Sequence, residues 1–278
     1  MKGLKKLLGL TLGAMMTISL VGCSSGSNEG EGTVEKLQQI KDAGVLVVGT
    51  SADYAPYEFH KQIDGEDKIV GFDITMAEEI AKDLGVKVEY KDMDFDGLLG
   101  ALEAEKVDIV LSGMTPDEER KKSVDFSELF YEDSNVCIVK KGKEDSIKSE
   151  DDLKKLKVGV QSGTTQADFI TGDLGITDAK QLKRMPDLML DLQNGNIDVI
   201  VTGKNVANIN IGQYDGLAIG KTTVGKEVAE STAAAIKKSN EKVDNTSLVE
   251  SINNTIKRLK DENKMDEYMQ EALKLAEK

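Results

Sequence analysis

Residues 107–120 read Val-Asp-Ile-Val-Leu-Ser-Gly-Met-Thr-Pro-Asp-Glu-Glu-Arg, and the rest of the chain is arranged around this stretch. Its apolar start predicts a buried strand, and its proline suits the first turn of a helix, where one N–H has no partner in the helix. A polar turn at residues 112–115 separates the two, and Arg120 follows about one helical turn later. Ligands of open α/β sheets bind at the carboxyl ends of strands, and the arginine fork suits a carboxylate. The alternative is an ordinary strand-turn-helix in which Arg120 pairs with a glutamate on its own solvated face.

The same pattern recurs 90 positions later. Residues 106–113 read Lys-Val-Asp-Ile-Val-Leu-Ser-Gly, and residues 196–203 read Asn-Ile-Asp-Val-Ile-Val-Thr-Gly. Leu99 and Met189 occupy matching places before the two copies, so a helix precedes each strand in the same register. The chain is therefore predicted to hold two similar α/β lobes, with a small-molecule site between their two polar turns.

Strands and helices alternate along the chain. Apolar or alternating runs predict strands at residues 45–49, 68–72, 86–90, 135–140, 157–160 and 182–185. Periodic apolar residues predict helices that begin at Asp73, Asp96, Pro116, Ser149 and Pro186, and two more at residues 248–259 and 265–276. This order is typical of an α/β fold in which each lobe is a mostly parallel sheet flanked by helices.

The amino terminus has the layout of a secretory signal. Three lysines precede an apolar run at residues 7–20, which is too short to span a bilayer comfortably. The run ends Leu-Val-Gly-Cys, which resembles a bacterial lipobox whose cysteine, here Cys23, receives a lipid. The predicted boundaries are a signal at residues 1–22 and a lipidated cysteine with a flexible tether at residues 23–44, which would hold the protein at a membrane surface. The alternative is a coincidental cysteine after the signal.

Composition excludes several classes of protein. The formal net charge is −14, and removal of the predicted signal, with three lysines and no acid, leaves −17. This charge argues against nucleic acid and against charge-driven binding to anionic membranes. Cys137 lies in an apolar strand and is interpreted as a buried free thiol, and His60, the single histidine, as a loop residue. We expect no metal site and no cofactor.

Five motifs together resemble the polar amino-acid solute-binding proteins of bacterial ABC importers. The resemblance covers residues 45–278 and implies a two-lobed, type II periplasmic-binding-protein-like fold with two hinge strands. It implies a first lobe at residues 45–133 and 225–278, and a second at residues 134–224. The motifs are Gly71-Phe-Asp-Ile, Met93-Asp-Phe-Asp-Gly-Leu, Ser112-Gly-Met-Thr-Pro-Asp-Glu-Glu-Arg-Lys, Val124-Asp-Phe-Ser and Gly159-Val-Gln-Ser-Gly-Thr-Thr.

The resemblance also implies a ligand site made of nine residues. Tyr54 and Phe95 would flank the side chain of the ligand, and Gln161 would lie near that side chain. The backbone of Ser112 and Gly113 would contact the amino group of the ligand, with Thr115 beside it. Arg120 would hold the α-carboxylate of the ligand, helped by the N–H groups of Thr164 and Thr165.

Two positions depart from the family pattern. Gly203 stands where the family usually carries an aspartate that binds the α-ammonium group, so a charge-assisted hydrogen bond is missing. Ser51 stands where members that bind basic amino acids or glutamine often carry an acid, which argues against a cationic ligand.

The expected function is a lipid-anchored extracytoplasmic binding protein that closes on a polar amino acid or related small carboxylate and delivers it to a permease and its ATPase. We expect a monomer. A surface sensor or adhesin that keeps the fold but has lost transport is the alternative, and the missing aspartate makes it credible. A dehydratase or lyase on the same fold is disfavoured because the nine positions include no His or Glu to act as acid or base.

Overall fold

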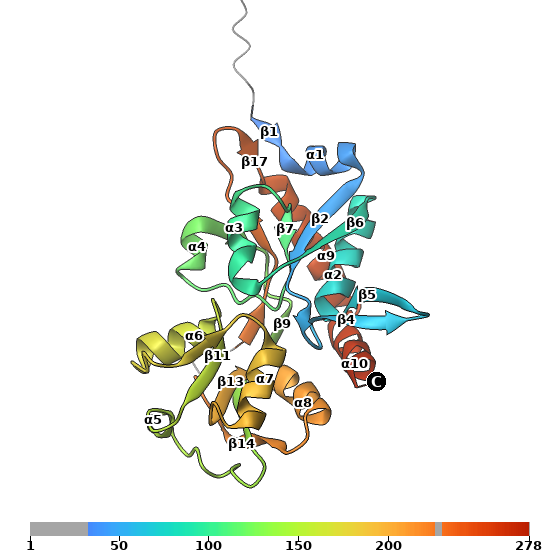
Figure 1. Ribbon diagram of the computed structural model, residues 1–278. Coiled ribbons are helices and arrows are strands. Elements are labelled where there is room, and N and C mark those ends of the chain that lie inside the picture. Colours follow the sequence, from blue (N-terminus) through green and yellow to red (C-terminus); the bar gives the residue numbers. More distant parts are fainter. Residues whose placement is uncertain (1–32, 226–229, 278) are drawn as a thin grey trace, which may run out of the picture. The chain divides into compact units, whose positions relative to one another are not determined.

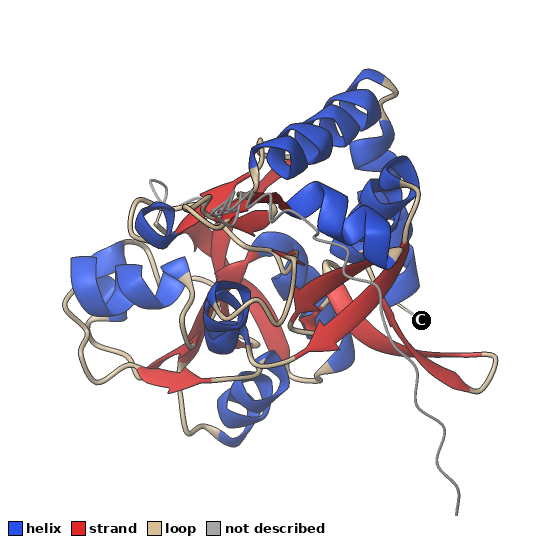
Figure 2. Cartoon of the chain, turned by 90° about the horizontal axis from the view of Figure 1, so that it is seen from above, coloured by secondary structure: helices blue, strands red, loops and turns tan. Residues whose placement is uncertain are grey.

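The computed structural model describes residues 33–225 and 230–277 (Figure 1). The predicted signal, Cys23 and the first part of the predicted tether lie outside the described residues. Two five-stranded sheets form the framework, and helices lie around the strands (Figure 2).

The first sheet is built from both ends of the described chain. Its strand order is β6 (Lys87–Asp92), β2 (Val45–Thr50), β7 (Ile109–Val110), β16 (Ala235–Lys237) and β8 (Val124–Phe126). Strand β2 runs parallel to β6 and β7, whereas β16 runs antiparallel to β7 and β8. Its helices are α1 (Lys36–Ala43), α2 (Phe72–Leu84), the 3₁₀ turn η1 (Phe95–Gly97), α3 (Leu98–Glu103), α4 (Arg120–Ser123), α9 (Thr246–Asp261) and α10 (Lys264–Ala276).

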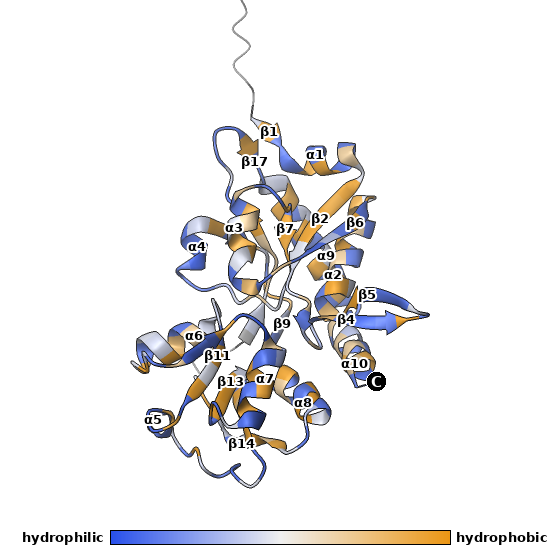
Figure 3. Cartoon of the chain, viewed as in Figure 1, coloured by the Kyte–Doolittle hydropathy of each residue, from blue (hydrophilic) through white to orange (hydrophobic). Residues whose placement is uncertain are grey.

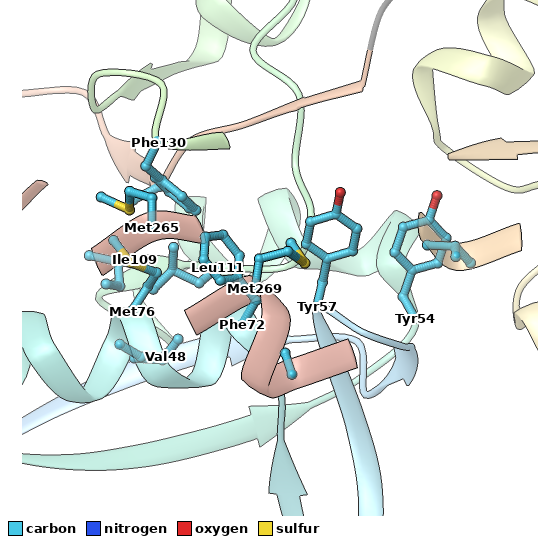
Figure 4. Packing of buried hydrophobic residues seen from close by; sticks show 14 of the residues in the cluster. Val48, Tyr54, Tyr57, Phe72, Met76, Ile109, Leu111, Phe130, Met265 and Met269 are labelled. Atoms are coloured by element: carbon cyan, nitrogen blue, oxygen red, sulfur yellow. The ribbon is translucent and has the colours of Figure 1, made fainter. Parts of the chain in front are cut away.

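The core of this part lies between the sheet and helices α2, α9 and α10. Val48 and Ile109 from the strands pack with Phe72 and Met76 of α2 and with Met269 of α10 (Figure 4). Each of these side chains is buried, and full burial of such side chains contributes roughly 1.5 to 3 kcal/mol each. Apolar strands are buried and hydrophilic ones are more exposed. Strand β2 is apolar and mostly buried, whereas the hairpin of β4 (Glu58–Ile63) and β5 (Glu66–Val70) is largely hydrophilic and more exposed (Figure 3).

The second sheet is formed by one continuous segment. Its strand order is β12 (Lys180–Leu182), β11 (Val158–Gln161), β13 (Val199–Gly203), β10 (Asn135–Lys140) and β14 (Leu217–Thr223). Strand β11 is parallel to its two neighbours, and β10 is antiparallel to its own. The helices of this part are α5 (Glu150–Leu153), α6 (Thr165–Asp168) with the π-helical turn η2 (Phe169–Asp173), α7 (Met185–Asn194) and α8 (Lys204–Gln213).

Two short strands connect the two sheets. The chain leaves the first sheet through β9 (Tyr131–Asp133) and returns through β15 (Glu230–Thr232), and these strands pair antiparallel. The first sheet therefore takes strands from both sides of residues 134–224, and all strands of the second sheet fall inside that range. The remaining strands are β1 (Val34–Glu35), β3 (Asp53–Tyr54) and β17 (Val243–Asp244).

The predicted repeat is present. Strands β7 and β13 begin 90 residues apart, and helices α3 and α7 precede them. Both strands are fully buried in their sheets. The two polar turns that follow them are therefore held by equivalent frameworks.

The tether prediction is wrong for residues 34–43. They form β1, which pairs parallel with β17, and the helix α1. Ile40 is buried and Leu37 packs against the main core, so this helix has an apolar face that the sequence reading overlooked. Gly44, with φ of 68°, ends the helix in the left-handed conformation that glycine adopts readily.

The helix predicted at Pro116 begins only at Arg120. The N–H of Ala233 donates to the carbonyl oxygen of Met114 at 3.1 Å, and the N–H of Ser231 donates to Oγ1 of Thr115 at 3.2 Å. These bonds keep the backbone extended beside a distant segment, so the local helix signal of the proline is overridden.

Four further expectations need correction. Asp73 does not cap α2 but lies within it, and Asp96 lies inside η1 without a side-chain cap. His60 belongs to strand β4, where its ring contacts Asp67 and Asp92. The strand predicted at residues 182–185 ends at Leu182, because Met185 already begins α7.

Candidate functional site

One small cavity lies where the carboxyl ends of β7 and β11 meet. Its volume is about 10 Å³, far below the roughly 300 to 1,000 Å³ usual for small-molecule sites, so the walls would have to move apart to admit a ligand. All nine predicted positions line it, together with Gln166, which the sequence reading missed. The lining residues are Tyr54, Phe95, Ser112, Gly113, Thr115, Arg120, Gln161, Thr164, Thr165 and Gln166. Their contacts with a ligand remain a prediction.

Arg120 is held firmly at this cavity. Its Nη1 donates to the carbonyl oxygen of Thr115 at 2.6 Å, its Nη2 donates to that of Gly163 at 2.8 Å, and its Nε lies 3.3 Å from Oδ2 of Asp117. The guanidinium carbon also lies 5.5 Å from the centre of the Phe95 ring. Arg120 is 9% exposed, so the alternative of an arginine on a solvated helix face is wrong.

The bonds of Arg120 leave donors for a ligand. A guanidinium has five N–H groups, and the contacts above engage one on each nitrogen. One N–H therefore remains on each terminal nitrogen, and such a pair suits the two oxygens of a carboxylate. Burial lowers the pKa of Arg120, and nearby Asp117 opposes this effect. An arginine remains charged in such surroundings.

Two buried acids accept hydrogen bonds from the turn after β7. The Gly113 N–H donates to Oδ2 of Asp73 at 2.7 Å, and the Ser112 hydroxyl donates to Oε1 of Glu58 at 2.8 Å. Gly113 has φ of 53°, which favours glycine at this place. An ammonium group needs oxygen acceptors, and the Ser112 hydroxyl already accepts the Ser51 N–H at 3.0 Å, so an ammonium at this turn would bond to main-chain carbonyl oxygens.

Asp73 has an unusual environment. Burial raises its pKa to about 7, and the hydrogen bond from the Gly113 N–H opposes this change. Among the described residues its Oδ1 has no hydrogen-bond partner. The acid is thus a structural support for the turn whose ionisation is costly.

Tyr54 closes the cavity on the side of β13. Its hydroxyl lies 3.1 Å from Oγ1 of Thr202 and 3.5 Å from the backbone nitrogen of Gly203. Its ring stacks on Tyr57 with the ring centres 5.9 Å apart, and both hydroxyls point the same way (Figure 4). Gly203 is buried and does not line the cavity, so the Tyr54 hydroxyl occupies the approach to the turn where the family usually carries an aspartate.

The second sheet contributes Gln161, Thr164 and Thr165. Thr164 is the N-cap of α6, and its Oγ1 accepts a hydrogen bond from the Ala167 N–H at 3.2 Å. Gln166 in the first turn of that helix donates through Nε2 to Oδ1 of Asn135 at 2.9 Å. Gln166 directly follows the predicted site residues Thr164 and Thr165, and this neighbourhood was a usable signal.

Charged residues join the two parts of the molecule beside Gln161. Nε of Arg184 lies 3.3 Å from Oδ2 of Asp53, and Nζ of Lys183 lies 2.8 Å from Oδ2 of Asp94. Burial raises the pKa of Asp53, whereas Arg184 opposes that change. The sequence alone could not identify Asp53, because its partners lie more than 100 positions away.

Other chemistry has little support within residues 33–225 and 230–277. No group of three or more His, Cys, Asp and Glu residues there could hold a metal ion, and no helix there is long and apolar enough to cross a membrane. Cys137 is buried and free, and burial raises the pKa of its thiol to about 12.

Comparisons with known proteins agree with this geometry. The sequence pattern of the bacterial extracellular solute-binding proteins, family 3, matches residues 46–274. The arginine-binding extracellular protein ArtP of Bacillus subtilis is 33% identical over 266 residues, which are 95% of this chain and 96% of that protein.

Solved structures are similar as well. An amino acid ABC transporter substrate-binding protein from Streptococcus pneumoniae, bound to L-arginine, has a TM-score of 0.80 and 32% identity, covering 87% of this chain and 98% of that chain. The ancestral amino acid-binding protein AncCDT-1, a precursor of cyclohexadienyl dehydratase, has a TM-score of 0.74 and 33% identity, covering 85% of this chain and 99% of its own.

Proposed function

The chain belongs to family 3 of the bacterial extracellular solute-binding proteins, and on this premise we propose that it binds one polar α-amino acid in the cavity at Arg120. Its fold is the predicted two-lobed α/β periplasmic-binding-protein fold. Membership also implies a location outside the cytoplasm. Delivery of the ligand to an ABC permease, and a lipid anchor at Cys23, are further parts of the proposal.

The observation that carries the proposal is the buried guanidinium of Arg120. It lines the nearly closed cavity between the two sheets, and its two remaining N–H groups suit a carboxylate. The main-chain carbonyls at the turn after β7 supply acceptors for an ammonium group. A ligand that carries both charges a short distance apart is an α-amino acid.

Catalysis is not part of the proposal. Similar proteins are binding proteins of transport systems, although AncCDT-1 relates the fold to a dehydratase. The cavity lining contains no His, Glu or Asp, so no residue there is suited to transfer a proton at neutral pH. Asp73, whose pKa burial raises to about 7, accepts the Gly113 N–H and is not among the lining residues.

A thermal-shift screen of the common L-amino acids tests the proposal directly. A ligand at a thousandfold excess over its Kd stabilises the folded protein by about 4 kcal/mol, which raises the melting temperature measurably. If none of the amino acids shifts the melting temperature while a non-amino carboxylate does, the α-amino acid assignment is wrong.

Substitution of Arg120 tests the anchor. Hydrogen bonds to charged groups contribute about 1.5 to 3 kcal/mol each, so Arg120→Ala is expected to weaken binding by roughly two to four powers of ten in calorimetry. Arg120→Lys should restore only part of the affinity, because an ammonium cannot reproduce the planar fork.

The matched control is Lys121→Ala, which removes a neighbouring cation whose partner is the exposed Glu118. It should bind like the parent. If Arg120→Ala stayed folded by circular dichroism and bound within about threefold of the parent, Arg120 would not be the anchor.

A further inference from the structure

The cavity at Arg120 has no acid to face the ammonium group of an amino acid. Gly203 stands where the family usually carries an aspartate for that group, and no Asp or Glu lines the cavity. The carboxylate of the ligand would neutralise Arg120, which leaves the ammonium group without an opposite charge in the lining. A site for an α-amino acid therefore needs a negative charge that acts from behind the lining residues.

Two buried carboxyl groups lie behind the turn after β7. Oδ2 of Asp73 accepts the Gly113 N–H at 2.7 Å, and Oε1 of Glu58 accepts the Ser112 hydroxyl at 2.8 Å. Both Ser112 and Gly113 line the cavity, so a single residue separates each acid from it. Asp73 is 1% exposed and Glu58 is fully buried. Water therefore screens little of the attraction between these acids and a cation in the cavity.

Asp73 is the acid whose charge can change near neutral pH. Burial raises its pKa to about 7, whereas the hydrogen bond from the Gly113 N–H opposes this change. The side chain also lies in the first turn of α2, where the helix dipole favours an anion. A cation on the far side of the turn favours the carboxylate further and lowers that pKa. A protonated Asp73 can therefore lose its proton when a cation binds in the cavity.

The groups around the turn and the start of α2 leave this response to the two acids. The titratable ones are the carboxyl group of Glu58 and the phenols of Tyr54, Tyr57, Tyr90 and Tyr131. Phenols keep their protons below about pH 8. Arg258 of α9 bonds to Glu79 and Asp83 further along α2, and the buried residues of α10 are apolar.

We propose that Asp73, assisted by Glu58, supplies the charge opposite the ammonium group of the ligand from behind the turn after β7, in place of an aspartate at position 203. Binding of an amino acid then releases the proton of Asp73 to the solvent. Neither acid touches the ligand, because Ser112 and Gly113 lie between them and the cavity. This inference rests on the proposed function and adds the groups that balance the ammonium charge.

Calorimetry at several pH values tests the inference on the unchanged protein. The probes are the common L-amino acids other than histidine and cysteine, whose side chains titrate near neutral pH. At about pH 6.5, each one that binds should release more than about half a proton, measured from the heats in two buffers with different ionisation enthalpies. The affinity should rise about tenfold from about pH 5.5 to pH 8, because Asp73 has already lost its proton at the higher pH.

Failure of the inference and failure of the proposed function give different results. If the amino acids bind without proton release, and with an affinity that stays within about twofold over this pH range, the inference fails and the proposed function stands. If no amino acid binds at any of these pH values, both fail.

Asp73→Asn removes the charge and keeps an acceptor for the Gly113 N–H. Its affinity should be close to that of the parent at about pH 5.5 and about tenfold weaker at pH 8, and its binding should release no proton. Glu78→Gln is the matched control, because it removes an acid further along the same helix whose pKa is also raised by partial burial and by Glu79. The control should keep the proton release and the pH dependence of the parent.

A second probe keeps the test independent of the folding of Asp73→Asn. It is the analogue of the tightest-binding amino acid in which a hydrogen replaces the α-ammonium group, and it is measured with the parent protein. Its binding should release no proton, and its affinity should not rise with pH. Proton release by this analogue equal to that by the amino acid, or a pH dependence in Asp73→Asn equal to that of the parent, would overturn the assignment.

Discussion

At the scale of single residues, Asp73 couples the candidate site to pH. Burial raises its pKa from 3.8 to about 7, so the folded protein binds this proton more tightly than the unfolded chain does. Stability from this group is therefore greatest below about pH 4 and is lost as the pH rises to about 7. Above that range, the folded state carries the cost of a buried charge, on the order of a few kcal/mol.

Asp73→Asn is expected to remove this slope. The amide oxygen can still accept the Gly113 N–H, and no charge is buried. Urea unfolding should give the variant and the parent similar stability near pH 4.5, and the variant should be more stable by a few kcal/mol at pH 8. Asp145→Asn, an exposed acid paired with Lys221, is the control and should leave the slope unchanged. An unchanged slope in Asp73→Asn would mean that Asp73 is ionised throughout this range.

At the scale of elements, local patterns were sufficient where an element depends on its own sequence. The apolar run of β10 predicted its exact bounds, Asn135–Lys140, and the stripes of α9 and α10 identified both helices. The helix expected at Pro116 failed because the backbone there pairs with residues 231–233. Such long-range pairing has no local signal.

Substitutions of Gly203, in the second copy of the repeated turn, separate the effect of a negative charge on ligand binding from the effect of a changed backbone conformation. Gly203 is the N-cap of α8 with φ of −63°, so other residues can adopt its backbone, and an acid is favoured at an N-cap. For an α-amino acid ligand, Gly203→Asp should hold or raise the affinity by supplying a partner for the ammonium group, provided that its carboxylate displaces the Tyr54 hydroxyl from this turn.

Gly203→Asn is the control for this change, because it caps the helix equally well and has no charge. In calorimetry the aspartate variant should bind more tightly than the asparagine variant. Binding weaker by a few kcal/mol in the aspartate variant would indicate a ligand without a free amine. Equal binding would show that position 203 does not face the ligand.

At the scale of the whole molecule, the site is assembled from two sheets. The family resemblance predicted the nine positions around the cavity. Eight of them lie in motifs at the end of a predicted strand or the start of a helix, and Tyr54 lies after the first predicted strand. The resemblance did not identify Asp53, whose contacts with Gln161 and Arg184 form only when the two parts meet. Individual motifs specify turns, whereas the pairing of residues across the cavity depends on the complete fold.

The place of the molecule in the cell gives the last prediction. The described residues contain no helix that could cross a membrane, and the net charge of −14 opposes binding to anionic lipids by charge. Cys23, which lies outside the described residues and follows the lipobox-like Leu-Val-Gly, is the proposed attachment point. Two or more lipid chains hold a protein firmly at a membrane, whereas one alone does not. Cys23→Ser should move the protein from the membrane fraction to the soluble fraction and abolish metabolic labelling with palmitate. Cys137→Ala, which removes the buried cysteine instead, should stay labelled and membrane-bound. If the Cys23→Ser protein remained with the membrane after a salt wash, an attachment other than lipid on Cys23 would have to hold it there.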